Sequence, residues 1–245
     1  MPADAPVPTG NRALPGHYET RWHVMPDAGS LATVASERIL DDASNAISTR
    51  GVFRIVLAGG TTPEAVYTRL GKATTDWLCW QIYFGDERCL PAGHPERNSA
   101  MANRCWLQHV PLPSANIHPI PAEQGATAAA AAYTQVVRAA RPFDLVLLGM
   151  GEDGHTASLF PGQAHAVDEL VHAVHAAPKP PADRVSLGVT ALNDATGVLV
   201  MLSGVGKHDA VRRWRHDEDL PITHIHGRTG ADVYLDKAAE TGAPA

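Results

Sequence analysis

Long apolar runs, a surplus of positive charge and paired cysteines are all missing from this chain of 245 residues. No stretch of about 18 apolar residues occurs, so no membrane-spanning helix is expected. The first eight residues contain three prolines, and no signal-peptide core follows them. We therefore expect a loose leader over residues 1–20 and one domain over residues 21–245, a length typical of a single α/β domain.

Basic residues are scarce: 20 lysines and arginines stand against 26 acidic residues, and the formal net charge is −6. A protein that binds duplex nucleic acid needs a basic face to neutralise phosphates, so no nucleic-acid partner is expected, although this balance still permits a local basic pocket. Three cysteines, Cys79, Cys89 and Cys105, form no CxxC pair and no even framework, which predicts reduced thiols and a cytoplasmic location.

Signals for a metal site and for a serine nucleophile are also missing. His224 and His226 share one face of a possible strand, but no third ligand follows at a telling spacing, so no metal is expected. No G-x-S-x-G nucleophile elbow surrounds Ser158. We expect three further histidines at the surface: His165, His172 and His175.

The chain does have an alternation of segments at helical spacing with short, β-branched runs. The expected helices cover Leu31–Ala46, Glu64–Lys72, Gly125–Ala140 and Lys207 to about Arg215. The expected strands cover Phe53–Ala58, Gln81–Phe84, Phe143–Leu148, Val185–Val189, Val198–Leu202 and Val233–Leu235. This alternation predicts an α/β fold with a mostly parallel sheet and helices on both of its faces.

Polar loops follow four of these strands, with the sequences GGTTP, DER, MGEDGH and GVGK. In open α/β sheets, ligands bind just beyond the carboxyl ends of the strands. We therefore expect the four loops to converge on one crevice.

The first of these loops, Gly59, Gly60, Thr61, Thr62 and Pro63, joins a strand to a helix, and we expect Thr62 as its N-cap and Pro63 as its first helical residue. Free N–H groups and hydroxyls at a helix N-terminus make an anion site, so a phosphate could dock here. A simple strand-to-helix turn is the alternative.

The last loop, Gly204–Lys207, places a lysine in the first turn of a helix, where its charge opposes the helix dipole unless an anion lies between them. It is not a Walker A loop, because Met201 and His208 stand where that motif needs glycine and Ser or Thr. Lys207 could therefore contact a phosphate, or it could be a solvated lysine.

Three charges, Asp86, Glu87 and Arg88, follow the strand that ends at Phe84. Arg88 could hold a carboxylate or a developing oxyanion, with the two acids orienting it. The alternative is a solvated ion-pair turn.

The stretch GMGEDGHTASLFPG begins with the pattern G-x-G-x-x-G, but it does not fit a dinucleotide loop. Glu152 and Asp153 would repel a pyrophosphate, and Pro161 and Gly162 end any helix that follows within about two turns.

A histidine fits this place if a proton has to move. An imidazole with an ordinary pKa of about 6.5 can act as a base at neutral pH, which makes His155 the candidate, with Asp153 to orient it. A structural histidine bonded to backbone is the alternative.

With these residues assembled, the chain resembles the 6-phosphogluconolactonases from about Trp22 to Ala239. The motifs that carry the resemblance are AGGTTP (58–63), GDERCLPAGHPERNS (85–99), GMGEDGHTASLFPG (149–162), DRVSLGVTALN (183–193) and SGVGK (203–207). The chain departs from the family pattern at Arg97, where many lactonases have serine.

The resemblance implies a single Rossmann-like domain and the substrate 6-phospho-D-glucono-1,5-lactone. We expect direct attack of water on the carbonyl of this lactone, with no cofactor or metal, and a monomer or weak homo-oligomer. We expect catalytic roles for His155, Asp153 and Arg88. We expect contacts to the substrate or its phosphate from Gly59, Gly60, Thr61, Thr62, Asp86, Asn98, Arg184 and Lys207; Arg184 comes from the resemblance alone.

Two other functions remain as alternatives. The related glucosamine-6-phosphate isomerases/deaminases share the glycine loops but have an aromatic residue after the Asp-Glu pair and a catalytic glutamate after the histidine. This chain has Arg88 and Leu159-Phe160-Pro161 there, which favours hydrolysis. The other alternative is a sugar-phosphate sensor without catalysis.

Overall fold

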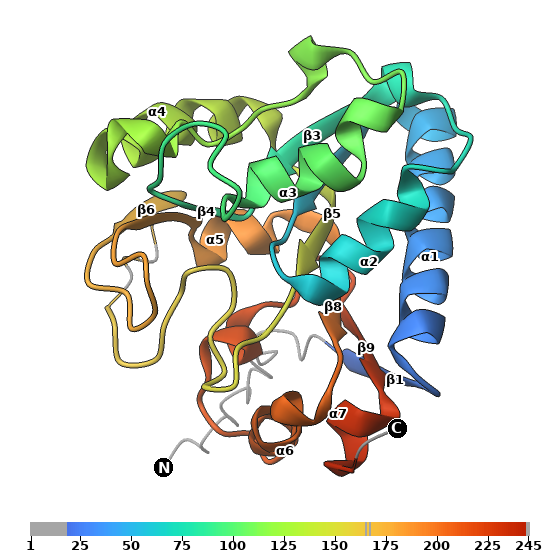
Figure 1. Cartoon of the computed structure of the whole chain (residues 1–245), viewed down its shortest axis with the longest axis vertical. Helices are drawn as coiled ribbons and strands as arrows, with labels where there is room; N and C mark the ends of the chain where they lie inside the picture. The colour runs from blue at the N-terminus through green and yellow to red at the C-terminus, as the bar shows by residue number, and fades with distance from the viewer. Residues whose placement is uncertain (1–18, 165, 167, 244–245) are drawn as a thin grey trace, which may run out of the picture.

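The computed structural model describes residues 19–164, 166 and 168–243. At its centre lies a parallel sheet of six strands in the order β1-β9-β8-β5-β2-β3 (Figure 1). The strands of this sheet are β1 (Thr20–Met25), β2 (Phe53–Leu57), β3 (Trp80–Phe84), β5 (Phe143–Leu148), β8 (Ala195–Leu202) and β9 (Ala231–Asp236). A second, antiparallel sheet has the order β4-β7-β6, with β4 (Asp86–Arg88), β7 (Arg184–Leu187) and β6 (Val171–Val174).

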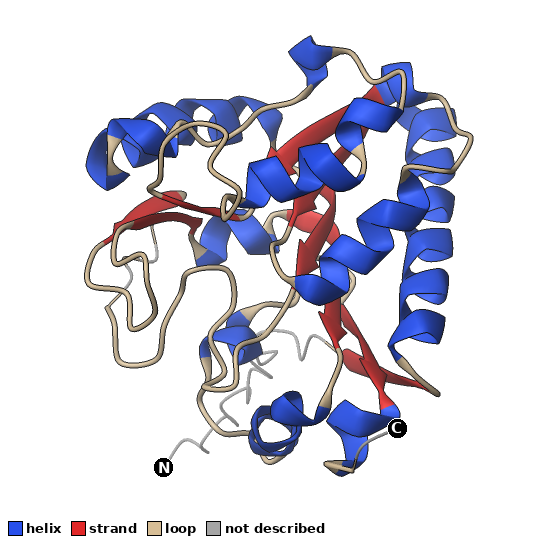
Figure 2. Ribbon diagram, in the orientation of Figure 1, coloured by secondary structure: helices blue, strands red, loops and turns tan. Residues whose placement is uncertain are grey.

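Helices cover the large sheet, with α1 and α2 on one side of it and α5 on the other (Figure 2). The helices are α1 (Ala28–Arg50), α2 (Thr61–Leu70), α3 (Asn98–Cys105), α4 (Ala126–Ala140), α5 (Val189–Asn193), α6 (His208–Arg215) and α7 (Lys237–Thr241). Over the described ranges, no helix combines the length and apolar character needed to cross a bilayer.

The predicted α/β fold is confirmed, because five of the expected strands form β2, β3, β5, β8 and β9. For the expected strand Val185–Val189, the prediction was wrong about the sheet to which it belongs and about the residue at which it ends. It lies in the small antiparallel sheet as β7, and Val189 begins α5. A short apolar run does not reveal which strand it pairs with.

Three strands escaped the sequence analysis: β1, β4 and β6. β6 is apolar and largely buried, but its four residues, VHAV, are too short a run to stand out. β4 consists of three charged residues, and the side chains of β1 are half-buried or exposed. Apart from Glu19 and Thr20, the leader expected over residues 1–20 lies outside the described residues, and Thr20 already begins β1.

The helix after β2 starts earlier than expected. α2 begins at Thr61, with Gly60 at the N-cap position in a positive-φ conformation (φ 111°) that glycine adopts freely. Thr62 is therefore not the N-cap, and its hydroxyl lies 3.0 Å from the hydroxyl of Ser203 instead. Pro63 is the third residue of the helix, where its missing N–H still leaves no hydrogen bond unmade.

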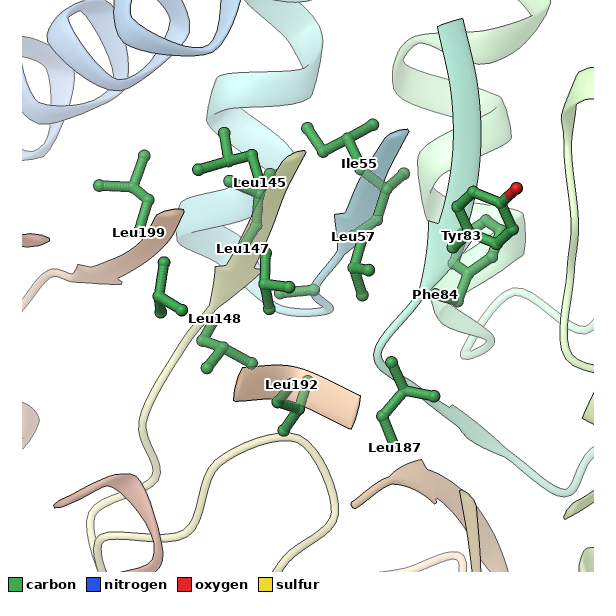
Figure 3. Close-up of a cluster of buried hydrophobic side chains, with 14 of the residues drawn as sticks. Ile55, Leu57, Tyr83, Phe84, Leu145, Leu147, Leu148, Leu187, Leu192 and Leu199 are labelled. Carbon is green, nitrogen blue, oxygen red and sulfur yellow. The ribbon is translucent and has the colours of Figure 1, made fainter. Parts of the chain in front are cut away.

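One hydrophobic core joins the two sheets (Figure 3). Leu148 at the end of β5 lies in the same cluster as Leu187 of β7 and Leu192 of α5, and all three side chains are at most 1% exposed. Because its apolar face is shared, the small sheet is part of the same domain, and it fixes β4 beside the carboxyl ends of the large sheet.

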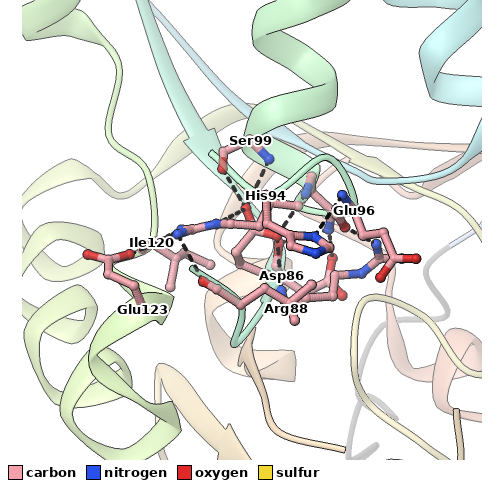
Figure 4. A network of polar contacts seen from close by, with 11 residues as sticks. Asp86, Arg88, His94, Glu96, Ser99, Ile120 and Glu123 are labelled. Atoms are coloured by element: carbon pink, nitrogen blue, oxygen red, sulfur yellow. Dashed lines mark hydrogen bonds and ion pairs between the residues drawn. The ribbon is translucent and has the colours of Figure 1, made fainter. Parts of the chain in front are cut away.

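Glu87 of β4 is fully buried and caps α3 from outside that helix. Its carboxylate accepts hydrogen bonds from the N–H groups of Asn98 (2.7 Å) and Ser99 (2.9 Å) and from the Ser99 hydroxyl (2.6 Å), part of the network in Figure 4. Free N–H groups and the helix dipole favour a carboxylate there. Arg97, at the N-cap position itself, makes no capping bond with its side chain.

Glu87→Gln should lower the free energy of unfolding by about 2 kcal/mol, because the amide NH₂ would face a buried N–H donor in place of an acceptor. Urea denaturation measures the change. Glu64→Gln is the matched control, since its side chain is 41% exposed and its pair with Arg104 contributes little. Equal stability of the Glu87 variant and the wild type would contradict the capping role.

Candidate active site

A cavity of about 360 Å³ opens beyond the carboxyl ends of β2, β3, β5 and β8. The four loops that follow these strands all contribute to its lining, as the sequence predicted. Of the expected site residues, Asp153 is not part of the lining; the others are: Gly59, Gly60, Thr61, Thr62, Asp86, Arg88, Asn98, His155, Arg184 and Lys207.

His155 lies in the wall of this cavity with a side chain that is 17% exposed. Its Nδ1 is 2.5 Å from Oδ1 of Asp153, and its ring packs against Phe160 with centroids 4.7 Å apart. Because the carboxylate accepts the Nδ1 proton, the lone pair of the neutral ring is on Nε2.

Glycine at position 151 makes room for this histidine. A Cβ on Gly151 would lie 2.1 Å from His155 Nδ1 and 2.5 Å from Asp153 Oδ1, distances that no side chain could relieve without moving the pair. The glycines of the GMGEDGH stretch therefore hold a His-Asp pair rather than a pyrophosphate.

The two members of the pair titrate in ways that suit a base. Burial lowers the pKa of His155 below its ordinary value, and the Asp153 carboxylate only partly opposes this. Burial raises the pKa of Asp153, but the hydrogen bond and charge of His155 lower it more, so the net pKa lies below the ordinary value. At neutral pH the site holds a neutral imidazole beside a carboxylate.

Lys207 lines the same cavity as the N-terminal residues of α2. It ends a short 3-10 turn (Val205–Lys207) and is the residue just before α6. Burial lowers the pKa of this lysine, and the carboxylate of Glu152 partly opposes that effect. With Gly60 and the hydroxyls of Thr61 and Thr62 in the same lining, the cavity has the donors and charge of an anion site.

Asp86 and Glu87 do not orient Arg88 as the sequence suggested. Asp86 accepts hydrogen bonds from Asn98 Nδ2 (2.9 Å) and from the Ser158 hydroxyl (2.7 Å), while Glu87 caps α3. Both acids are buried, so a solvated ion-pair turn is also wrong. Arg88 instead donates from Nη1 to the carbonyl of Glu96, which holds its guanidinium at the edge of the cavity.

Asn98 lines the cavity, whereas its neighbour Arg97 does not. The Asn98 amide fills the space beside Gly59, where a Cβ would lie 2.0 Å from Asn98 Oδ1. Arg97, which replaces the common serine, is 3% exposed and donates to the carbonyl of Ile120 (2.7 Å) and to Glu123 (2.8 Å). Arg97 therefore binds neighbouring segments together and is not part of the cavity lining.

Arg184 is 6% exposed and holds the loop before β7 against the cavity. Its Nη2 donates to the carbonyls of Lys179 (3.0 Å) and Pro180 (3.1 Å), and its Nε donates to Pro181 (3.2 Å). No hydrogen bond from Nη1 is found in the described part of the chain, so this group is available to a ligand.

The proline-rich segment Pro178–Pro181 is part of the site, because Lys179 and Pro180 line the cavity. No sequence pattern singles out Lys179. The only signal was its place in a proline-rich loop a few residues before an arginine that begins a strand.

Three expectations about histidines have different outcomes. His175 is exposed as predicted, His172 is 4% exposed and was wrongly placed at the surface, and His165 lies outside the described residues. The ring of His172 lies against Gly188, where an added Cβ would be 2.6 Å from Nε2, and its Nδ1 is 2.8 Å from Oε2 of Glu169.

His224 ends a 3-10 turn (Pro221–His224) and does not share a strand with His226. In the ranges that the structure describes, no three His, Cys, Asp or Glu side chains gather as metal ligands would.

Comparisons with known proteins agree with this geometry. The 6-phosphogluconolactonase of Mycobacterium tuberculosis is 35% identical over 90% of this chain and 97% of its own length. The crystal structure of 6-phosphogluconolactonase from Thermotoga maritima has a TM-score of 0.84 at 28% identity, covering 89% of this chain and 100% of that one.

A monomeric glucosamine-6-phosphate deaminase has a TM-score of 0.80 at 21% identity, covering 91% of this chain and 100% of that one, which is a likeness of fold alone. The family model described as glucosamine-6-phosphate isomerases/6-phosphogluconolactonase matches residues 26–234. The chain belongs to the glucosamine-6-phosphate isomerase/6-phosphogluconolactonase family.

Proposed function

We propose that this chain hydrolyses 6-phospho-D-glucono-1,5-lactone to 6-phospho-D-gluconate in the oxidative pentose phosphate pathway. The chain is a lactone hydrolase by its family and by its relatives, which are named 6-phosphogluconolactonases. One observation supports the substrate above all: the imidazole of His155 shares a single cavity with a lysine and with the N-terminus of α2. Such a cavity suits a molecule with a phosphate at one end and a reactive carbonyl at the other.

In the proposed reaction, Nε2 of neutral His155 takes a proton from water as the water oxygen bonds to C1 of the lactone. The electron pair of the C1 carbonyl moves onto its oxygen. When this tetrahedral intermediate collapses, the bond between C1 and the ring oxygen breaks, and the ring oxygen receives the proton back from His155. The new carboxylic acid loses its proton to solvent, and no covalent enzyme intermediate forms.

The other residues of the site orient the two ends of the substrate. We assign to Asp153 the orientation of the imidazole and to Arg88 the stabilisation of the oxyanion. The phosphate binds Lys207, Nη1 of Arg184 and the Gly60–Thr62 loop, which fixes the lactone relative to His155. Asp86, Asn98 and Gly59 shape the wall between them.

Phe160 argues against the deaminase alternative. Its ring is 1% exposed and packs against His155, in the segment where that branch of the family has a catalytic glutamate. No carboxylate of the described residues other than Asp86 lines the cavity, and both oxygens of Asp86 are hydrogen-bonded.

The direct test is a coupled assay with freshly generated lactone, corrected for its spontaneous hydrolysis. The purified chain should accelerate ring opening and leave glucosamine 6-phosphate unchanged. Binding of 6-phosphogluconate without acceleration above the buffer rate would favour the sensor, and turnover of glucosamine 6-phosphate would favour the deaminase.

His155→Ala should lower kcat by about 10²- to 10⁴-fold, because general base catalysis is lost. Urea denaturation should give a stability close to that of the wild type. His216→Ala, which removes an exposed histidine outside the cavity, should leave kcat unchanged. Turnover of the His155 variant at the wild-type rate would remove this residue from the mechanism.

The pH profile of kcat/KM should rise with pH and level off, because only the neutral imidazole accepts a proton. Since burial lowers the pKa of His155, the half-maximal point should lie below the ordinary value of about 6.5. Asp153→Asn should move the half-maximal point lower still, because it removes the carboxylate that raises this pKa. A half-maximal point above about 7 would contradict the assignment.

A further inference from the structure

Cations outnumber carboxylates in the lining of the cavity. Four cationic side chains line it: Arg88, Lys179, Arg184 and Lys207. Asp86 is the one carboxylate in the lining formed by the described residues, and its oxygens already accept hydrogen bonds from Asn98 and Ser158. Outside the lining, Glu152 and Asp153 also act on Lys207. A phosphate monoester brings between one and two negative charges at neutral pH, so the four cations can still serve a second anionic group of the ligand.

Lys179 is the cation that the proposed reaction has not used. It is exposed, but its backbone is fixed, because Arg184 donates to its carbonyl and to the next one, and the N–H of Ala177 donates to the carbonyl of Ala182 across the loop (2.9 Å). A buried guanidinium thus holds this one lysine at the cavity mouth, unlike a lysine on a free surface loop.

The charge of Lys179 acts on groups at both ends of the proposed substrate site. Burial is the main cause of the low pKa of His155, and the positive charge of Lys179 lowers it further. The same charge lowers the pKa of Lys207, after the larger effects of burial and of Glu152. Lys179 therefore lies within electrostatic reach of both the proposed base and the proposed phosphate site.

The reaction creates a new negative charge beside the base. The C1 carbonyl of the lactone is neutral, its oxygen becomes an oxyanion when water adds, and C1 ends as a carboxylate after the ring bond breaks. A cation within reach of His155 stabilises each of these later states more than the substrate.

We propose that Lys179 binds the negative charge that develops at C1, first on the oxyanion and then on the carboxylate of the product. This inference rests on the proposed function. Lys179 would then raise the affinity for ligands with a carboxylate at C1 over ligands that are neutral there. This role is distinct from binding the phosphate.

Two ligands test the role of Lys179 by binding alone. 6-Phosphogluconate has a carboxylate at C1, and glucitol 6-phosphate has a neutral hydroxymethyl group there on a chain of the same length. Calorimetric titration should show that the wild type prefers 6-phosphogluconate. Lys179→Ala should weaken binding of 6-phosphogluconate by about 3- to 10-fold and change the affinity for glucitol 6-phosphate by less than about twofold.

Three variants serve as controls. Lys179→Arg should restore the preference, since it keeps the charge. Lys207→Ala should weaken both ligands alike, because both have the phosphate. Lys72→Ala removes an exposed lysine outside the cavity and should change neither affinity.

The proposal is overturned if Lys179→Ala weakens both ligands equally, if it weakens neither, or if the wild type shows no preference between them. Because the titrations need no turnover, failure of the lactone assay with the carboxylate preference intact would refute the hydrolase function and leave the binding role of Lys179 standing.

Discussion

Two buried carboxylates, Asp86 and Glu87, hold the active site together. They are neighbours in β4, and their side chains hold different segments: Glu87 caps α3, and Asp86 binds Asn98 of that helix and Ser158 of the loop after β5. Burying two acids costs free energy unless every oxygen finds a donor, and here each carboxylate has several. The positions of Gly59, Arg88 and the histidine loop all depend on this arrangement.

Burial, more than charge, explains how a histidine beside an aspartate remains neutral. Burial lowers the pKa of His155, Asp153 partly opposes it, and the nearby lysine lowers it further. The same aspartate fixes the ring through Nδ1. The Asp153 carboxylate thus holds the ring of the proposed base in place, while burial, with a smaller effect of Lys179, keeps that ring neutral at neutral pH.

Much of the large sheet and part of the candidate site could be predicted from the sequence. Strands buried on both faces read as short apolar runs, and the loops beyond their carboxyl ends meet in space, which brought His155 and Lys207 to one cavity. Arg184 and Lys179 could not be found in this way, because β7 belongs to the small antiparallel sheet. The roles of Asp86 and Glu87 were misread, since a charged triplet gives no sign that its acids are buried against another helix.

The four cations of the cavity have a consequence for how ligands arrive. The chain as a whole is negative, with a formal net charge of −6, so its long-range field opposes the approach of a sugar phosphate. The lining of the cavity has four cations and one carboxylate, and low-dielectric walls concentrate their field at the opening. The cavity therefore attracts anions during diffusion, before any contact forms. Added salt weakens this attraction by shortening the distance over which the field acts.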